Sequence, residues 1–461
     1  MDLASRLRAI VRGHGGLREL TYEPDNGGYR ATIDLERVGE MLGGRPVSTP
    51  FGQCLVIDRR YEADRLHGDV RIDECELHDT EGLRLLDPML EFAGSDVSGS
   101  PSLGRTIFLD LETTGLSGGA GTIAFLVGCG YFDLGAFQVR QFLLASHATE
   151  RALLAAVAGF FAGADLIVTY NGKTFDLPVM ETRWLFHRIT PPLEGVPHFD
   201  MLHPARRLWR NRSRLRSTTR AGPPFRAGVL DEPQSSDDAC CRLSTLERLL
   251  FDVTRVGDVP GLEIPGRFFG FVRSGDPRPL EPVLEHNRLD LVSLAAVTAR
   301  AARLAQQGHE ACRDGSEALA LGRVYERAGS FDRAEACFRG AAASDATEIK
   351  AEALYRLALR FRRDRRYEEA AAIWRDVLAW TERTRGKRSL LELRQVAAEA
   401  LAIHLEHRRR DLTGARTHAL FALEQSNACR ADDVRHRLAR IDRKLAKKKN
   451  PGSEDPGLYP S

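Results

Sequence analysis

Two carboxylates at the end of an apolar segment have the types and spacing that metal-dependent hydrolysis requires. Asp110 and Glu112 stand two positions apart in the run TIFLDLE at 106–112. Residues two apart in a strand point to the same face, so both carboxylates project together. Like charges this close repel each other, and a bound divalent cation keeps both ionised. The pair therefore indicates a cation site; the alternative is a strand end with two solvated acids.

Two further acids and a histidine extend this pattern. Asp176 lies where a strand meets the helix expected at 178–188, and its alternative role is to cap that helix. His286 and Asp290 are four residues apart within a helix expected at 282–306, so they share one helical face. Asp290 can hold a metal there while His286 orients a water as general base, or the two form only a surface pair.

The combination of the three segments is more specific than any one of them. Along the chain the order is Asp-x-Glu, then Asn-x-x-x-Phe-Asp, then His-x-x-x-Asp. Four acids that converge on one point allow two hard cations with oxygen ligands, and Mg²⁺ or Mn²⁺ suits such ligands. Two ions about 4 Å apart stabilise both the attacking and the leaving oxygen of a phosphodiester displacement. The sequence thus favours nucleic acid as the substrate.

Residues beside these acids are candidates for holding the substrate. Thr113, Thr114 and Gly115 can bring main-chain N–H groups and hydroxyls near a terminal nucleotide. Asn171 either contacts a phosphate or fixes its own loop, and Lys173 either approaches a phosphate or is simply solvated.

An arginine-rich insertion is expected at 203–238. Its part up to residue 228 carries eight Arg and no acid, and Arg206, Arg207 and Arg210 stand at about helical spacing. Such a cluster can neutralise a phosphate backbone. The alternative is a solvated surface segment.

The segments that must position these residues alternate between strand and helix patterns. Apolar runs predict strands at 106–112, 122–132, 137–144 and 165–170, and apolar residues at helical spacing predict helices at 149–162, 178–188, 243–251 and 282–306. Three strands, a helix, a strand and a helix in this order predict an α/β fold, a mixed sheet with flanking helices.

Five stretches of this region carry a resemblance to a known family: FLDLETTGLSGGAGTIAFLVG (108–128), NGKTFDLPVMETR (171–183), HFDMLHPARRLW (198–209), LSTLERLLF (243–251) and HNRLDLVSL (286–294). They are similar to the DEDD exonucleases of the ribonuclease H-like superfamily, and closer still to its YprB-like branch. The resemblance covers about residues 100–305. It implies metal-dependent 3′→5′ removal of nucleotides, with metal ligands at Asp110, Glu112, Asp176 and Asp290.

One position departs from the family pattern. Members with a catalytic His place it five residues before the last Asp, whereas members with a Tyr place it four before. His286 has the second spacing. It is therefore either the base or water-positioning group, in the place of the tyrosine, or a structural residue.

A repetitive helical region follows from Glu317. The unit at 320–341 has a counterpart at 355–377, at an offset of 36 residues that aligns Ala334 with Ala370. Small residues at helix crossings and aromatic residues between helices are what stacked helix pairs require. The unit resembles the tetratricopeptide repeat at six positions: Leu321, Gly322, Tyr325, Ala334, Phe338 and Ala341. The resemblance implies a protein or peptide partner in a concave face; the alternative is that the repeats only extend the first domain.

Global composition excludes some other classes. The 461 residues carry 66 basic and 64 acidic side chains, a formal net charge of +2, and only seven of the basic residues are Lys. Any basic surface is therefore made of guanidinium groups, which suit phosphate forks. No run reaches the roughly 20 apolar residues of a membrane helix. The N-terminus shows no secretory signal and the eight Cys form no Cys-x-x-Cys pair, so we expect a cytoplasmic protein without a membrane partner.

The chain is expected to comprise several parts. These are a β-rich extension of unclear role (1–100), a ribonuclease H-like exonuclease domain (101–308), helical repeats (315–443) and a disordered tail (444–461). Two other functions stay open: a scaffold that binds nucleic acid or protein without catalysis, and an endonuclease of the same fold. The sequence does not distinguish DNA from RNA as substrate.

Overall fold

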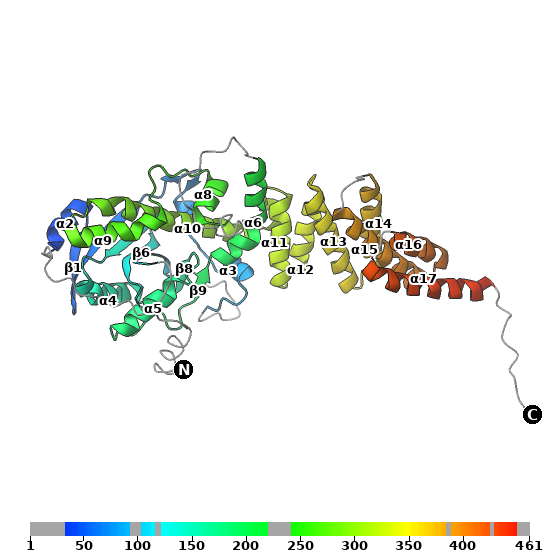
Figure 1. Cartoon of the computed structure of the whole chain (residues 1–461), viewed down its shortest axis with the longest axis horizontal. Helices are drawn as coiled ribbons and strands as arrows, with labels where there is room; N and C mark the ends of the chain where they lie inside the picture. The colour runs from blue at the N-terminus through cyan, green and yellow to red at the C-terminus, as the bar shows by residue number, and fades with distance from the viewer. Residues whose placement is uncertain are drawn as a thin grey trace, which may run out of the picture.

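A mixed β-sheet with helices on both faces occupies one end of the molecule, and a row of helices extends from it (Figure 1). This computed structural model describes residues 33–92, 103–115, 121–219, 241–383, 389–424 and 428–449. None of the helices in those ranges is long and apolar enough to cross a membrane.

The sheet has seven strands. Across the sheet they are β1 (Arg45–Thr49), β2 (Gly52–Tyr61), β7 (Ala136–Leu143), β6 (Ala124–Asp133), β5 (Thr106–Thr113), β8 (Leu166–Thr169) and β9 (His198–Asp200). The pairs from β1 to β5 are antiparallel, whereas β5, β8 and β9 run parallel. The predicted mixed α/β sheet is confirmed. The carboxyl ends of the three parallel strands therefore meet at one edge.

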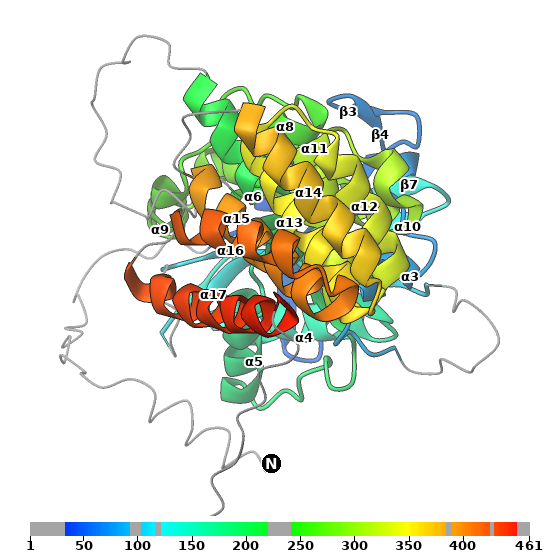
Figure 2. The same cartoon turned by 90° about the vertical axis from the view of Figure 1, so that its right-hand side faces the viewer.

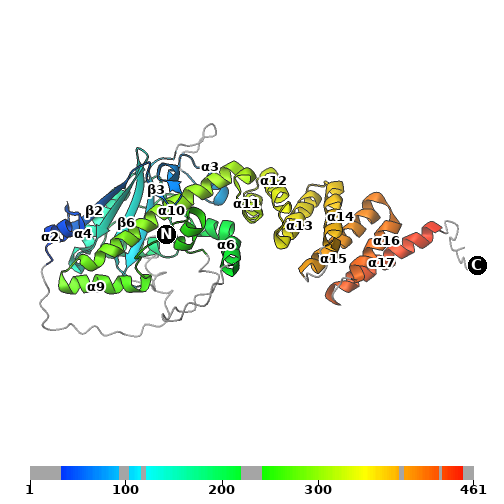
Figure 3. The ribbon, with the colours of Figure 1, turned by 90° about the horizontal axis from the view of Figure 1, so that it is seen from above.

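Residues of β5 alternate between two cores. Phe108 packs into the core that contains Leu291 and Leu294 of α10 (Glu281–Gln307). Leu109 packs on the opposite face with Leu153. That second face is covered by α4 (Glu150–Phe161) and α5 (Asp176–Phe186). Helix α10 crosses the first face, as Figure 3 shows. Asp110 and Glu112 continue the Phe108 side, so they face the same side as α10.

The predicted strands and helices of this region lie close to the observed ones. The hairpin between β6 and β7 turns at Leu134 and Gly135, whose φ angles are 51° and 75°. The helix predicted at 243–251 is α8 (Leu243–Phe251). Two further elements were not expected: β9 and α9 (Ile264–Ser274). The arginine-rich segment begins as α6 (Leu202–Thr219), and its residues 220–238 lie outside the described part.

The N-terminal segment contributes to the same sheet. β2 lies along β7, pairing Leu55 with Leu143, and β1 forms the edge. The segment also adds α2 (Leu35–Leu42) and α3 (Glu81–Leu86), which packs on α10. The alternation of apolar and polar residues at 69–79 predicts a strand, and this prediction is wrong. Only Val70–Arg71 is extended there, because Ile72 and Cys75 turn in to pack in the α10 core. The Gly- and Ser-rich run at 94–104 predicts a linker, and its residues 94–102 lie outside the described residues.

The row of packed helices starts directly after α10. It comprises α11 (Gly315–Arg327), α12 (Phe331–Ala342), α13 (Thr347–Arg363), α14 (Tyr367–Arg383), α15 (Ser389–His404), α16 (Leu412–Glu424) and α17 (Ala428–Lys449). Each contacts the next, and Figure 2 shows them stacked toward the viewer. Because α17 ends at Lys449, the first part of the expected disordered tail is helical, and residues 450–461 lie outside the described ranges.

Buried contacts fix α11 to the sheet domain. Trp209 of α6 donates a hydrogen bond from Nε1 to Oε1 of Glu317, at 2.9 Å. Arg300 of α10 forms an ion pair of 3.1 Å with Oε2 of the same carboxylate, which is fully buried. Tyr325 also donates to the main-chain oxygen of Ala305 at 2.6 Å. The first helix of the row is therefore anchored to both α6 and α10.

Candidate active site

Asp110 and Glu112 lie where β5 reaches the edge shared with β8. In the register with β6, Asp110 is opposite Gly128 and Glu112 is opposite Leu126. The side chains of Asp110 and Glu112 are partly exposed. Thr113, the last residue of β5, is buried. The two carboxylates point to one face, as the strand period predicts.

Asn287 of α10 holds Asp110 in place. Its Nδ2 donates to Oδ2 of Asp110 at 2.7 Å and to the main-chain oxygen of the same residue at 3.2 Å. Its Oδ1 accepts from Nε2 of Gln141 at 2.8 Å, and Asn287 is fully buried. Sequence reasoning missed this residue. The sequence feature related to Asn287 is Gly128, because a Cβ on Gly128 would lie 2.1 Å from Oδ1 of Asn287.

Asp176 comes from the next parallel strand's carboxyl end. It is the first residue of α5, whose cap position is held by Phe175, so it does not act as the N-cap. The side chain is buried. Burial, together with the nearby charge of Asp200, raises the pKa of Asp176 to about 7, although hydrogen bonds from the main-chain N–H groups of Leu111 and Asp176 itself oppose that rise.

Asp290 reaches the site from α10 and is oriented by an arginine. Arg255 donates from Nη2 to Oδ1 of Asp290 at 2.6 Å, and from Nε to Oε1 of buried Glu247 at 2.7 Å. Burial acts to lower the pKa of Arg255, but Asp290 and Glu247 outweigh it and raise the pKa. Glu247 also accepts from Ser293, which contacts Nε2 of His67 at 2.9 Å. Sequence reasoning did not identify Arg255 or Glu247.

His286 stands between two sets of carboxylates. Its Nδ1 lies 2.6 Å from Oδ1 of Asp258, and its Nε2 lies 3.4 Å from Oδ2 of Asp290 and 4.0 Å from Oε1 of Glu112. Burial of Asp258 works to raise its pKa, but the hydrogen bond and charge of His286 lower it overall. With Nδ1 bonded to Asp258, Nε2 faces the acids.

The acids are close enough to perturb one another. Burial is the main cause that raises the pKa of Asp110, followed by the charges of Asp290, Glu112 and Asp176. Burial likewise raises the pKa of Glu112, with Asp290 and Asp176 as the next causes. Because these carboxylates carry like charges close together, they create a strongly negative electrostatic potential at one point.

The donor set fits hard divalent cations. All four acids present oxygen, the ligand that Mg²⁺ and Mn²⁺ prefer, and their repulsion is what a cation relieves. Within the described ranges, no three side chains of His, Cys, Asp or Glu are gathered closely enough to form a ready metal site. Asp290 in particular is paired with Arg255, so ion binding requires a local rearrangement of these side chains.

The candidate substrate residues are engaged in local contacts. The Thr113 hydroxyl donates to the main-chain oxygen of Gly115 at 2.8 Å, and the Thr114 hydroxyl accepts from the N–H of Ile123 at 3.1 Å. These hydroxyls shape the loop after β5.

Asn171 and Lys173 form the loop after β8. Asn171 has a φ of 69°, and its Oδ1 accepts from the Thr174 hydroxyl at 2.9 Å, which favours the loop-fixing alternative. Asp200 accepts from the N–H groups of both Asn171 and Lys173, at 2.8 and 3.1 Å, and from that of Leu202 at the start of α6. The Nζ of Lys173 forms an ion pair of 3.3 Å with Asp87.

Arg206, Arg207 and Arg210 lie on α6 beside α11. No contact between them and the four acids of the site is found among the described side chains. The structure therefore gathers Asp110, Glu112, Asp176, His286 and Asp290 at one place, and puts the three arginines at another.

Comparisons with known proteins agree with this geometry. Residues 107–302, which include all four acids and His286, match the RNase H superfamily. The chain is also 28% identical over 418 residues to the uncharacterized protein YprB of Bacillus subtilis (strain 168), covering 88% of this chain and 90% of the relative. The sheet domain described above is thus similar to the RNase H superfamily, and the chain as a whole is similar to YprB over most of its length.

Proposed function

We propose that this chain is a cytoplasmic metal-dependent nuclease that removes nucleotides from the 3′ end of single-stranded nucleic acid. The observation that carries the proposal is that the acids meet around one helix turn: Nε2 of His286 lies 3.4 Å from Oδ2 of Asp290 and 4.0 Å from Oε1 of Glu112. The next residue, Asn287, holds Asp110 at 2.7 Å. The similarity to the RNase H superfamily, whose members process nucleic acid, is the reason for proposing nucleic acid as the substrate.

Two Mg²⁺ or Mn²⁺ ions would be held by the carboxylates of Asp110, Glu112, Asp176 and Asp290. When bound, such ions polarise the scissile phosphate and stabilise the charge of the leaving oxygen. Asn287 keeps the Asp110 carboxylate aimed at the site through its 2.7 Å hydrogen bond. Arg255 occupies Oδ1 of Asp290, which leaves Oδ2 on the side of His286.

His286 acts as the general base in this proposal. Asp258 accepts a hydrogen bond from Nδ1–H, so that Nε2 carries the free lone pair. Nε2 takes the proton of the attacking water, and Asp258 stabilises the imidazolium that forms. Asp258 is thus a positioning residue that sequence reasoning did not identify.

The substrate end would be held by the two loops at this edge. Because the Thr113 and Thr114 hydroxyls are engaged within the chain, main-chain N–H groups around Thr113 to Gly115 are the expected contacts. Lys173, whose side chain is 40% exposed, reaches a phosphate by releasing Asp87. Asn171 holds the loop that presents Lys173.

The row from α11 onward is proposed to be a tetratricopeptide-like array. Leu321, Tyr325, Ala334, Phe338 and Ala341 are buried, and a Cβ on Gly322 would lie 2.5 Å from the Phe338 ring. These contacts support helix pairs packed through small and aromatic residues. We propose that residues 101–308 form the nuclease domain and residues 315–443 the helical array. A peptide is the candidate partner of the array.

An oligonucleotide assay tests the nuclease proposal. A 5′-labelled single strand, as DNA and as matched RNA, is incubated with Mg²⁺ or Mn²⁺. A ladder shortening from the 3′ end with release of mononucleotides is expected. Cleavage of a circular strand would instead assign an endonuclease, and binding without turnover would assign a scaffold.

A further inference from the structure

A pocket of about 290 Å³ lies between α6 and α11, where the sheet domain meets the row of helices. Among its described lining residues, five are arginines and none is acidic: Arg206, Arg207, Arg210, Arg323 and Arg327, with Leu208, Ala320 and Val324 beside them. The two helices contribute arginines four residues apart, Arg206 with Arg210 and Arg323 with Arg327. Each pair therefore lies on one face of its helix.

The positive charge of this pocket is only partly neutralised. Arg323 pairs with Glu352, and Arg207 donates from Nη1 to the main-chain oxygen of Leu86 at 3.0 Å. Within the described part of the chain, Arg210 and Arg327 have no acidic partner. Several arginines further along the row do pair with acids: Arg360, for instance, pairs with Asp364 at 2.6 Å.

Burial makes this uncompensated charge costly. The Nε atoms of Arg210 and Arg323 are buried and have no hydrogen-bond partner among the described atoms. Burial, followed by the charge of Arg327, lowers the pKa of Arg207. Guanidinium groups held this way gain from an anion that accepts several hydrogen bonds at once.

The pocket walls are fixed before any ligand arrives. Trp209, between the pocket arginines of α6, is fully buried and bonded to Glu317 at the start of α11. Leu208 and Val324 in the walls are buried as well. A preformed site of this kind loses little conformational entropy on binding.

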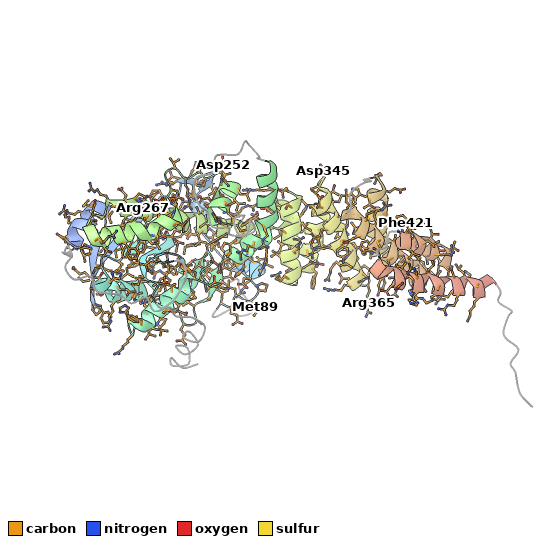
Figure 4. The ribbon with its side chains drawn as sticks, in the orientation of Figure 1. Met89, Asp252, Arg267, Asp345, Arg365 and Phe421 are labelled. Atoms are coloured by element: carbon orange, nitrogen blue, oxygen red, sulfur yellow. The ribbon has the colours of Figure 1, made fainter. Side chains whose placement is uncertain are left out.

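A chain of contacts connects the pocket to the acidic site. Arg207 binds the oxygen of Leu86, and the adjacent Asp87 binds Lys173, which stands three residues before Asp176. In Figure 1, α3, α6 and α11 lie together at this junction. Met89, which follows α3 and is 83% exposed, marks the lower border of the junction in Figure 4. A strand whose end lies at Asp176 can thus pass Lys173 toward the arginines.

We propose that the pocket between α6 and α11 binds backbone phosphates of the nucleic-acid strand whose 3′ end is processed, so that the first helix of the row forms part of the substrate track. This inference rests on the nuclease proposal for the identity of the strand. The planar forks of the five arginines match phosphodiester oxygens, and the excess of positive charge among the described lining residues favours an anionic ligand.

The test measures binding without turnover. Asp110→Asn protein is titrated into a 5′-fluorescein-labelled single-stranded 20-mer without divalent ions, and anisotropy is followed across a salt series. Each lost phosphate contact reduces the slope of log K against log salt by about 0.7 for a single strand. Arg210→Gln combined with Arg327→Gln is therefore expected to reduce the slope by about 1.4 and to weaken binding several-fold.

Matched variants separate this effect from general loss of charge or fold. Arg37→Gln removes one exposed charge on α2, at the opposite end of the sheet domain, and should leave the slope unchanged (Figure 1). Arg327 is itself exposed, so Arg327→Gln alone should keep the melting curve of the parent while reducing the slope, and Arg327→Lys should restore it.

Equal slopes for the parent and the double variant would overturn the proposal. A loss of slope no larger than that caused by Arg37→Gln would also overturn it. So would a poly-aspartate peptide that displaces the 20-mer equally well from the pocket variant and from the parent. Because the readout needs no catalysis, a reduced slope, together with no mononucleotide release by the wild-type chain in Mg²⁺ or Mn²⁺, would retain the pocket and reject the exonuclease.

Discussion

Asn287 on α10 and Asp110 on β5, 177 positions apart in sequence, are joined by a hydrogen bond of 2.7 Å between Nδ2 and Oδ2. The bond is buried against Gly128, which leaves room for the amide because it has no side chain. Together with the apolar packing of α10, this contact helps to fix the long helix relative to the strand. It also aligns His286 and Asp290 with the carboxylates of β5, since both lie on the same helix.

Gly128→Ala is expected to disrupt this alignment. The new Cβ would lie 2.1 Å from Oδ1 of Asn287, so Asn287 and α10 must shift. A displacement of about 1 Å can cost on the order of 10²-fold in rate, and overpacking costs about 1–3 kcal/mol of unfolding free energy. Rates of nucleotide release and denaturant melts measure both. Gly159→Ala is the control, because its Cβ meets no atom within 4 Å; equal effects of the two changes would contradict the role of Gly128.

His286→Gln is expected to lower kcat by about 10²–10⁴-fold with little change in KM, as removal of a general base does. Asp258→Asn should lower kcat by a smaller factor, because it removes only the group that orients Nδ1. Steady-state kinetics on a labelled oligonucleotide separate kcat from KM. A variant with wild-type kcat but reduced unfolding free energy would instead assign His286 the structural role left open by its spacing.

Asp176 should make the stability of the ion-free protein depend on pH. Its pKa is about 7 in the folded chain, well above its ordinary value, so the folded state binds the proton more tightly than the unfolded state. This contribution is fully present below about pH 4 and is lost as pH rises through about 7, a loss of at most about 4 kcal/mol.

Chemical denaturation from pH 4.5 to 8 in EDTA measures that dependence, and Asp176→Asn should reduce it, leaving the part due to Asp110 and Glu112. Added Mn²⁺ should raise the melting temperature more at pH 8 than at pH 5, because the ionised carboxylates bind the cation and the protonated ones do not. A variant that retains the full pH slope would contradict the assignment to Asp176.

Gly322→Ala should destabilise the row of helices. The added Cβ would lie 2.5 Å from the ring of Phe338, and such overpacking costs about 1–3 kcal/mol. Gly270→Ala in α9 meets no atom within 4 Å and should be neutral or stabilising by up to about 1 kcal/mol. Urea melts followed by circular dichroism compare the two, and a neutral Gly322→Ala would argue against close packing of α11 on α12.

Local periodicity explains why part of the site was predictable. The strand period placed Asp110 and Glu112 on one face, and the helix period placed His286 beside Asp290, at 3.4 Å in the structure. These relations depend only on neighbours in sequence. The apolar runs likewise predicted β5 and β8, because continuous burial leaves a continuous pattern.

The remaining parts of the site depend on contacts between distant segments. Arg255 reaches Asp290 across 35 positions, and Asp258 reaches His286 across 28, with no period to reveal either. The same holds for the N-terminal segment, which the sequence predicted to be β-rich without revealing that β2 pairs with β7. The arginines of α6 were visible in sequence, whereas their junction with Arg323 and Arg327 required the fold.

The proposed chemistry is tested most directly by mononucleotide release from a single-stranded oligonucleotide, measured for the wild-type chain and for Asp110→Asn combined with Glu112→Gln. The wild-type chain should shorten the strand from its 3′ end only when Mg²⁺ or Mn²⁺ is present. The double variant should bind the strand and release nothing above the uncatalysed rate. Unchanged release by the double variant, or wild-type release that persists in EDTA, would contradict a metal-dependent site built on these carboxylates.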